Sequence, residues 1–479
     1  MTKQPVMNSV CPAPFQLNTS LLKKVLMTAL SRGGDFADLF LEYRTSLSIS
    51  MEEDIIKESE ETLTIGLGIR VIKKDRTGYA YANDLNEEKL IKAARAAAVI
   101  ADQRISRPRP VAFRPIRVKN RVAPVKKLAT ALPLDEKIDL VSRAYQAALN
   151  FDPAIKKVQV IYAESTQYIW ILNSEGISVK DCRPMIKLTV HSLAERQGHR
   201  ESGYYGGGGR VGLEYFKNSM TPETIARESA REACLLLEAS EAPAGSWPII
   251  LSPGHSGVLI HEAVGHLLEA DFIRKKTSIF WDKLGQKVAS EQVTIYDDPT
   301  IPGFRGSYNI DDEGTRPERT LLIDRGLIKE FLQDKLSARL MGKKANGHGR
   351  REDFSHWPLP RMSNTYLAPG EYSPEEIIHS VKKGFYVSRL SGGQVEDSGQ
   401  FTFSVTLGFL VENGRLTRPV KQATLIGTNL DILQKVEMVG HDLDFGLQTA
   451  TCGKEAQQVP VNDGCPTMKI TGMTIGGQL

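Results

Sequence analysis

The sequence predicts an α+β protein, in which an N-terminal α/β domain of antiparallel strands and helices is followed by a β-rich C-terminal domain. Three observations support this prediction. Residues 46–83 alternate between apolar and polar side chains, as strands do, and residues 86–104 are Ala-rich and typical of a helix. After residue 250, short apolar runs separated by turns predominate. The 479 residues are enough for two or three domains with a sizeable core.

The predicted N-terminal domain covers residues 1–240. Its first helix, 18–32, has Asn18, Thr19 or Ser20 as a candidate cap. A later helix begins after Thr221, which precedes Pro222 in the first turn, and reaches about Glu238. Residues 135–149 predict another helix. The predicted strands cover 46–51, 64–72, 79–82, 158–162, 168–172, 177–180 and 186–194.

The predicted C-terminal domain covers residues 241–479. It starts with the Ala-, Pro- and Gly-rich stretch 241–246, which is typical of a linker. The apolar run Trp247–Leu251 predicts a strand that leads into a helix with two closely spaced histidines. Hairpins and short helices are expected beyond it.

Composition argues against several classes of function. Lys and Arg number 61 against 57 Asp and Glu, so the net charge of +4 gives no general argument for nucleic-acid binding. No run of about 18 apolar residues predicts a membrane span, and the first thirty residues do not resemble a signal peptide. Five scattered cysteines do not form a disulfide framework. We therefore expect a cytoplasmic protein.

Residues 104–127 form a basic, Pro-interrupted stretch without an acidic residue. Two interpretations are open: a solvated linker between helical regions, or a strip that binds nucleic acid. The stretch is short and matches no nucleic-acid-binding fold, so the linker is favoured.

The stretch from Ile260 to Asp271 carries the main chemical signal. His261 and His266 flank Glu262 in a His-Glu-x-x-x-His pattern, which combines two nitrogen ligands with an acid beside them, as in a catalytic zinc site. At about 100° per residue, side chains at i and i+5 diverge by roughly 140° on a regular helix. Both rings could reach one metal only if a π-bulge widened the helix, and we predict one at Ala263–Gly265.

A catalytic zinc usually has a third protein ligand. The candidates are Cys452, Glu269, Asp271 and His255. Glu269 lies three residues after His266 and could reach the same face, although a solvated carboxylate is an equal alternative. Cys452 offers a thiolate, a good zinc ligand, but a lone cysteine is more often a small buried side chain. The residues alone leave this choice open.

The chain resembles the TldD/PmbA family of metallopeptidases, and specifically its catalytic, TldD-type branch. The matching stretches occur in the family's order and cover most of residues 250–470. They are 261–271, 289–291, 306–314, 333–342, 349–352, 360–366, 392–395, 423–427, 438–440, 452–455 and 459–461. The first half matches more weakly, at 66–70 and 206–210.

This resemblance implies Zn²⁺ bound by His261, His266 and Cys452, with Glu262 as general base. It also implies unfolded peptide substrates and a dimer, formed either by two copies or with a PmbA-type sister subunit that lacks the metal motif. The chain departs from the family pattern at Ala456, where Gly is more usual, and at Cys465, where Gln is more usual.

Hydrolysis needs a donor for the oxyanion, and the sequence offers four candidates for binding substrate: His255, Arg350, Arg351 and Tyr366. The two arginines could instead pair with Glu352 and Asp353. The leading hypothesis is a zinc-dependent peptidase. The alternatives are a non-catalytic binding or regulatory protein on the same scaffold, since family members have been called modulators of DNA gyrase, and a nucleic-acid-associated protein. Glu262 argues against the former, and we expect no nucleic-acid or membrane partner.

Overall fold

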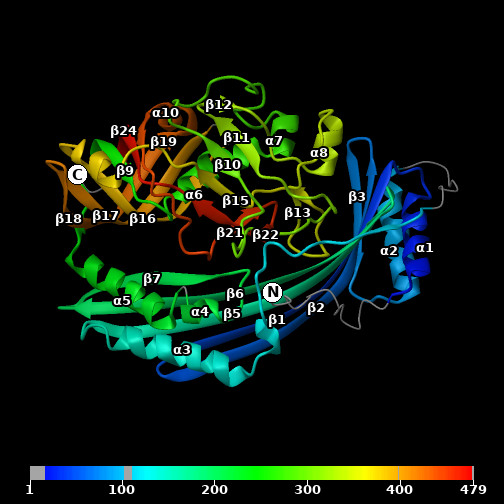
Figure 1. Cartoon of the computed structure of the whole chain (residues 1–479), viewed down its shortest axis with the longest axis horizontal. Helices are drawn as coiled ribbons and strands as arrows, with labels where there is room; N and C mark the ends of the chain where they lie inside the picture. Colours follow the sequence, from blue (N-terminus) through cyan, green and yellow to red (C-terminus); the bar gives the residue numbers. More distant parts are fainter. Residues whose placement is uncertain (1–16, 102–110, 219, 397–398, 477–479) are drawn as a thin grey trace, which may run out of the picture.

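The computed structural model describes residues 17–476, with the exception of 102–110, 219 and 397–398. Figure 1 shows the long strands of the N-terminal half beneath and beside a second β-rich region built from the C-terminal half. The predicted α+β content is thereby confirmed.

The N-terminal half forms one seven-stranded sheet in the order β3-β2-β1-β5-β6-β4, with β7 also paired to β6. Its pairs are antiparallel except for the parallel pair β4–β6. The strands are β1 (Phe36–Glu52), β2 (Ile55–Lys73), β3 (Arg76–Ala82), β4 (Arg114–Ile116), β5 (Ile155–Asn173), β6 (Ile177–Arg196) and β7 (His199–Gly209).

Strands β5 and β6 are far longer than predicted, because each joins two segments that the sequence predicts as separate strands. The polar residues in the middle of β5 remain in the sheet because they find buried partners. Glu164 accepts a hydrogen bond from Nζ of Lys137 at 2.6 Å, and Gln167 donates one to Glu42 at 2.8 Å. Buried polar groups are normally hydrogen-bonded in this way.

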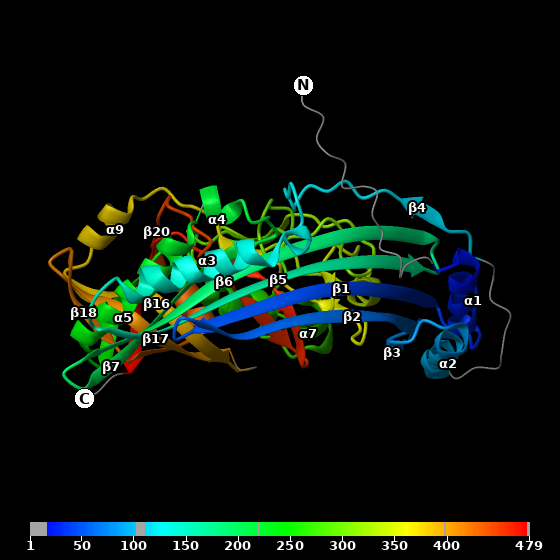
Figure 2. The same cartoon turned by 90° about the horizontal axis from the view of Figure 1, so that it is seen from below.

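Two pairs of helices pack on this sheet, one pair near each end (Figure 2). They are α1 (Thr19–Leu30) with α2 (Glu87–Ala98), and α3 (Leu134–Leu149) with α5 (Pro222–Glu238). Two predicted caps are confirmed: Asn18 accepts from the amide of Ser20, and Thr221 accepts from the amide of Thr224. Short turns lie at η2 (Val99–Ala101), η3 (Ala129–Ala131) and α4 (Tyr215–Asn218).

The C-terminal half contains an eight-stranded sheet in the order β16-β9-β24-β19-β17-β18-β8, with β20 paired to β24. A further pairing between β16 and β17 closes five of these strands into a barrel. The strands are β8 (Ser240–Glu241), β9 (Gly245–Leu251), β16 (Lys383–Val395), β17 (Gln400–Glu412), β18 (Arg415–Lys421), β19 (Ala423–Thr428), β20 (Val436–Val439) and β24 (Met468–Gly476).

A five-stranded sheet, β12-β11-β10-β15-β23, packs next to the barrel, and two short hairpins, β13–β14 and β21–β22, complete this half. These strands are β10 (Ile295–Asp297), β11 (Thr320–Asp324), β12 (Leu327–Ile328), β13 (Gly349–Arg350), β14 (Leu359–Pro360), β15 (Asn364–Leu367), β21 (Thr451–Lys454), β22 (Gln457–Pro460) and β23 (Asn462–Gly464). The helices are α6 (Gly257–Ile260), α7 (Ala270–Lys275), α8 (Lys335–Leu340), α9 (Pro374–His379) and α10 (Asn429–Gln434).

One hydrophobic core runs through the C-terminal half and includes both the barrel and the histidine helix. Phe385 and Phe403 of the barrel belong to it, as do Ile260 and Val264 beside the histidines and Cys452 of β21. The histidine helix is therefore held by the main core, as a preorganised site requires.

The predicted linker 241–246 is only partly a linker. Strand β8 pairs in parallel with β18, and β9 already begins at Gly245, because the backbone of this stretch completes the C-terminal sheet. The domain division at residue 240 stays a prediction.

The basic segment 104–127 lies partly outside the described residues, at 104–110. In its described part, β4 pairs with β6, and the amides of Arg121 and Val122 donate to the side chain of Asn309. Where the chain is described, no helix is long and apolar enough to cross a membrane.

Candidate metal centre

The two motif histidines lie on a helix whose winding changes along its length. It begins as α6, continues as a π-helical segment, η4 (His261–Gly265), and tightens into a 3-10 turn, η5 (His266–Leu268). The predicted widening at Ala263–Gly265 is confirmed. A π-helical turn contains an extra residue, so side chains at i and i+5 come to one side, and the two ring centroids are 5.1 Å apart.

Two glycines let this helix approach its neighbours closely. A Cβ atom on Gly257 would lie 2.6 Å from the amide nitrogen of Gly464, and one on Gly265 would lie 1.9 Å from Sδ of Met362. The backbone of Gly265 is helical, at φ −57° and ψ −55°. Gly265 therefore provides space for Met362, and the π-turn does not depend on glycine's conformational freedom.

His261, His266 and Cys452 each offer one ligand atom, and these three atoms lie within 4.8 Å of one another. The Nε2 atom of His266 is 3.3 Å from Sγ of Cys452. His261 and Cys452 are buried, whereas His266 is partly exposed. Two imidazoles and a thiol, open to solvent on one side, fit a catalytic zinc, which leaves one position for water or substrate.

Carboxylates orient both rings. The Nδ1 atom of His261 lies 2.7 Å from Oδ1 of Asp463, and Nδ1 of His266 lies 3.1 Å from Oε2 of Glu269. A carboxylate oxygen accepts, so each Nδ1 donates its hydrogen and each Nε2 is left as the ligand atom. Metal-binding histidines commonly have such carboxylate partners.

Cys452 reaches the helix on the hairpin β21–β22, where it pairs with Val459. The fully buried guanidinium of Arg361 anchors it: Nη2 donates to the carbonyl oxygen of Cys452 at 2.7 Å and contacts its Sγ at 3.2 Å. A cation beside the sulfur favours the thiolate, the form that binds metal.

Glu269 and Asp271, two of the candidate third ligands, support the site from outside the group of three. Both accept from Nζ of Lys454, at 2.9 and 2.7 Å. Lys454 lies on the same hairpin as Cys452, so this buried ion pair also links the hairpin to the helix.

His255 and Cys465 also lie outside the group. His255 donates from Nε2 to the carbonyl oxygen of Leu390 at 2.7 Å. The Cys465 thiol donates to the carbonyl oxygen of Pro466 at 3.0 Å, and burial raises its pKa well above the usual value. Cys465 is therefore held as a neutral thiol.

Glu262 is half-buried beside the histidine pair. Its Oε2 atom is 3.9 Å from Nε2 of His266. Burial raises the pKa of Glu262, and this effect outweighs the opposing charges of the two histidines. A carboxyl group whose pKa is shifted toward neutrality can both accept and return a proton.

The charges of the cluster favour a cation. Burial opposes the Cys452 thiolate, but the two imidazoles outweigh burial and hold the pKa of Cys452 well below its usual value. Burial also opposes a charged His266, but Glu269 and Cys452 outweigh it and raise the pKa of His266 to about 9. Without a metal, protons on the rings therefore provide the positive charge that the thiolate and carboxylates demand.

The other predicted substrate-binding residues lie apart from the three ligands. Arg350 donates to the carbonyl oxygens of Met362 and Pro460. Arg351 donates to the carbonyl oxygens of Asp312 and His356, among others. Among the described residues, neither arginine pairs with Glu352 or Asp353, so that structural alternative is wrong.

Tyr366 is mostly buried in an aromatic cluster. It stacks on Tyr296, with ring centroids 5.6 Å apart, and meets the edge of Phe445 at 5.1 Å. Its role in substrate binding stays a prediction.

The sequence interpretation missed three residues that hold the site together: Asp463, Arg361 and Lys454. A signal was available for Lys454, which follows the candidate ligand Cys452 by two positions. Asp463 is 202 residues away from His261 and gave no such signal. Arg361 is 91 residues away from Cys452 in the chain and gave no local signal.

Most of the chain matches models of one protein family. Residues 37–101 match the PmbA/TldA metallopeptidase domain 1, residues 127–237 match its central domain, and residues 244–477 match its C-terminal domain.

Individual proteins of this kind are similar to the chain in sequence or in fold. The metalloprotease TldD homolog of Haemophilus influenzae is 39% identical over 478 residues and is aligned over 97% of both chains. The zinc metalloprotease TldD homolog of Saccharolobus solfataricus is 33% identical over 243 residues, which are 50% of this chain and 54% of the relative. A protein of Thermotoga maritima proposed to be a modulator of DNA gyrase shares the fold, with a TM-score of 0.78 and 22% identity over 96% of this chain and 100% of that one.

Proposed function

Because the chain belongs to the PmbA/TldD family of metallopeptidases, we propose that it is a zinc-dependent peptidase that hydrolyses unfolded or short peptides. The cluster of His261, His266 and Cys452 carries the proposal. It combines ligand atoms of the right kind with carboxylate-oriented rings and an adjacent acid, Glu262.

Zinc is the proposed metal for two reasons. A thiolate with two imidazoles is a donor set that suits zinc, whereas magnesium and calcium prefer oxygen ligands. One relative is also named a zinc metalloprotease. His261 and His266 would hold the ion through Nε2, and Cys452 would hold it through Sγ.

When bound, a zinc ion supplies Lewis-acid chemistry, which polarises a peptide carbonyl and lowers the pKa of water to about 7. Glu262 accepts the proton of the attacking water on its carboxylate and returns it to the leaving amine. Its raised pKa suits both transfers. His261 and His266 keep their ligand atoms aimed at the site because Asp463 and Glu269 hold their Nδ1 hydrogens.

The proposal also covers the localisation and the oligomeric state of the enzyme. We propose that it acts in the cytoplasm as a dimer, either of two copies or with a PmbA-type sister subunit. The scattered cysteines support the cytoplasm, and the family resemblance supports the dimer.

The experiment compares peptide hydrolysis and bound zinc in the wild type and in Glu262→Gln. Wild type should cleave an unfolded peptide, lose activity with a chelator and regain it with zinc. Glu262→Gln should keep its zinc but lose roughly 10²–10⁴-fold in turnover, as expected when a general base is removed. Glu291→Gln, on an exposed loop, is a matched control and should leave turnover unchanged. Chelator-resistant hydrolysis would refute the proposal.

A further inference from the structure

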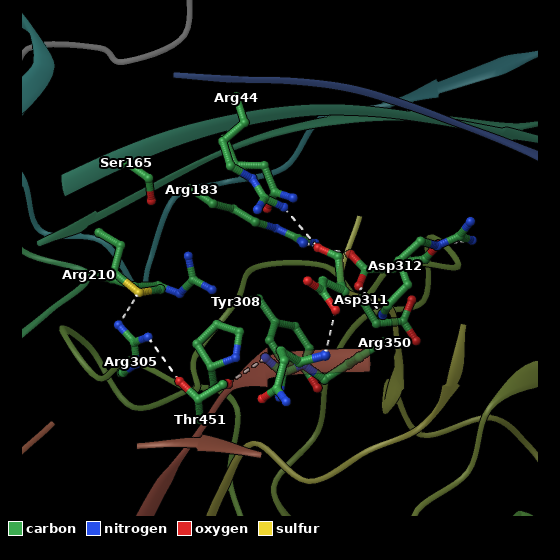
Figure 3. A pocket seen from close by; sticks show the side chains of 16 residues that line it. Arg44, Ser165, Arg183, Arg210, Arg305, Tyr308, Asp311, Asp312, Arg350 and Thr451 are labelled. Atoms are coloured by element: carbon green, nitrogen blue, oxygen red, sulfur yellow. Dashed lines mark hydrogen bonds and ion pairs between the residues drawn. The ribbon is translucent and has the colours of Figure 1, made fainter. Parts of the chain in front are cut away.

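A cavity of about 250 Å³ lies between the N-terminal sheet and the C-terminal half (Figure 3). Strands β1, β5 and β6, with the end of β7, form one wall, and C-terminal segments that include the hairpin β21–β22 form the other. Six arginines line it: Arg44, Arg183, Arg210, Arg305, Arg350 and Arg351.

Three of these arginines have a carboxylate partner. The pairs are Arg44 with Glu42 at 2.5 Å, Arg183 with Asp312 at 2.6 Å, and Arg351 with Asp38 at 3.5 Å. Two further carboxyl groups line the cavity, Asp311 and Glu352. Burial and the nearby Glu313 raise the pKa of Asp311 well above its usual value, and its oxygens accept from the backbone amides of Glu313, Thr315 and Gly349. Glu352 accepts from the amide of Gln458 at 2.7 Å.

The other three arginines have no carboxylate partner among the described residues. Arg305 donates to the carbonyl oxygen of Ala450 at 2.9 Å and to Oγ1 of Thr451 at 3.3 Å. Arg350 donates to backbone carbonyl oxygens only. These acceptors are uncharged. The carboxylates that attract these arginines, Asp181 for Arg210 and Asp312 for Arg350, are already paired with Arg183.

Of these three arginines, Arg210 is the least compensated by other groups, and its side chain is only 4% accessible to solvent. Within the described part of the chain, its guanidinium makes no hydrogen bond or ion pair, and its Nε is buried without an acceptor. Burial, Arg183 and Arg350 lower the pKa of Arg210 to about 9. An unpaired buried charge is costly, and an anion in the cavity would remove that cost.

The backbone fixes Arg210 at this place. It follows the Gly-rich end of β7, and its amide donates to the carbonyl oxygen of Gly303 at 2.9 Å. A Cβ atom on Gly209 would lie 2.3 Å from the same oxygen, at a φ of +132° that favours glycine. The glycine run thus allows the end of β7 to contact the C-terminal half. This contact places Arg210 in the cavity lining.

The cavity is separate from the metal cluster, although both use the hairpin β21–β22. Successive residues of a strand point to opposite faces. Thr451 and Pro460 form one cross-strand pair and line the cavity, whereas Cys452 and Val459 form the next pair and face the other way.

We propose that this cavity binds a small oxyanion of the carboxylate or phosphate class, with Arg210, Arg305 and Arg350 supplying the donors. Guanidinium groups bind both anions through paired N–H donors. The anion has two sources: free inorganic phosphate, or the C-terminal carboxylate of a bound peptide. Only the second source rests on the proposed peptidase function.

The first arm of the test is calorimetric titration of the full-length, zinc-loaded protein with inorganic phosphate in a low-salt, phosphate-free buffer. Wild type should bind about one phosphate per chain, and Arg210→Met should bind at least about tenfold more weakly, since a charge-assisted hydrogen bond is lost. Arg210→Lys should retain part of the affinity. Arg227→Met is the matched control, because it removes the same charge from an exposed site on α5, and it should bind like wild type.

The second arm uses an unfolded peptide with a free C-terminal carboxylate and the same peptide as its C-terminal amide, both titrated into Glu262→Gln to prevent turnover. If the peptide is the source, the free acid should bind more tightly than the amide, and Arg210→Met should abolish this difference. If phosphate is the source, the two peptides should bind equally while the phosphate arm is positive.

The proposal fails if wild type binds phosphate no better than Arg210→Met and also does not distinguish the free acid from the amide. Arg305→Met should reproduce the loss in either arm, so a folding failure of one variant leaves the other to decide. Bound zinc and peptide turnover, measured on the same samples, separate this failure from a failure of the peptidase proposal.

Discussion

The Nδ1 atom of His261 lies 2.7 Å from Oδ1 of Asp463, although 202 residues separate them in the chain. This contact joins the π-helical segment to β23 and fixes which nitrogen of the ring faces the metal site. Replacing Asp463 with Ala should therefore weaken zinc binding about 10–100-fold, the usual cost of removing such a partner. Competition with a chromophoric chelator measures the affinity. Asp442→Ala is the control, because its carboxylate accepts from the amide and hydroxyl of Thr467 and from none of the ligands. Equal affinities of the two variants would contradict the assignment.

A methyl group at Gly265 should destabilise the protein. The backbone there is already helical, so propensity alone would favour alanine. The new Cβ would instead overlap Sδ of buried Met362, which is 1.9 Å from its position. Overpacking of this kind costs about 1–3 kcal/mol. Urea denaturation of Gly265→Ala measures the loss, and Gly265→Ala with Met362→Ala should recover part of it. No recovery would show that the glycine is needed for another reason.

Lys454 should be among the most sensitive charged positions. Its buried Nζ pairs with Glu269 and Asp271, and Lys454→Met would remove this shared cation from both carboxylates. Breaking a buried ion pair from one side costs about 3–5 kcal/mol. The control is Lys275→Met, which removes a half-exposed lysine that pairs with Glu455 at 3.6 Å. Because such an exposed pair contributes little, this variant should cost about 1 kcal/mol or less. Equal unfolding free energies for the two variants would contradict the predicted role of Lys454.

Asp334 should make the fold less stable at neutral pH than at acidic pH. Burial and the charge of Glu313 raise its pKa from 3.8 to about 6. The folded state therefore binds the proton more tightly, and stability falls as pH rises from about 4 through about 6. Asp334→Asn keeps an acceptor for the amide of Ser337, which Asp334 caps, but cannot ionise.

The Asn variant should match wild type near pH 4 and exceed it by about 1–3 kcal/mol above pH 6.5. Denaturant melts across this pH range measure the difference. If Asp334→Asn is instead less stable than wild type at pH 7, the Asp334 charge is compensated in the folded state and the prediction is wrong.

Local signals in the sequence predicted several elements well. Asn18 and the pair Thr221-Pro222 mark helix starts because capping chemistry is local. The i, i+5 spacing of His261 and His266, together with the assumption that both rings bind one metal, predicted the π-helical turn.

Other features depend on partners that are distant in the chain. The middle of β5 looks like a loop because it is polar, and its Glu164 and Gln167 find partners, Lys137 and Glu42, that are distant in the chain. Asp463 and Arg361 support ligands from 202 and 91 residues away, and no local pattern marks them. Cys452 was one candidate among several until the resemblance to a family favoured it.

The central claim is that zinc is held by two histidines of one widened helix and by Cys452 of the hairpin. Its most direct test is the zinc content, by mass spectrometry, of purified wild type, Cys452→Ala and Cys465→Ala. Wild type and Cys465→Ala should each hold about one zinc per chain, and Cys452→Ala should lose most of it, since removal of one of three protein ligands greatly weakens a site. Full zinc in Cys452→Ala, or its loss in Cys465→Ala alone, would contradict the account.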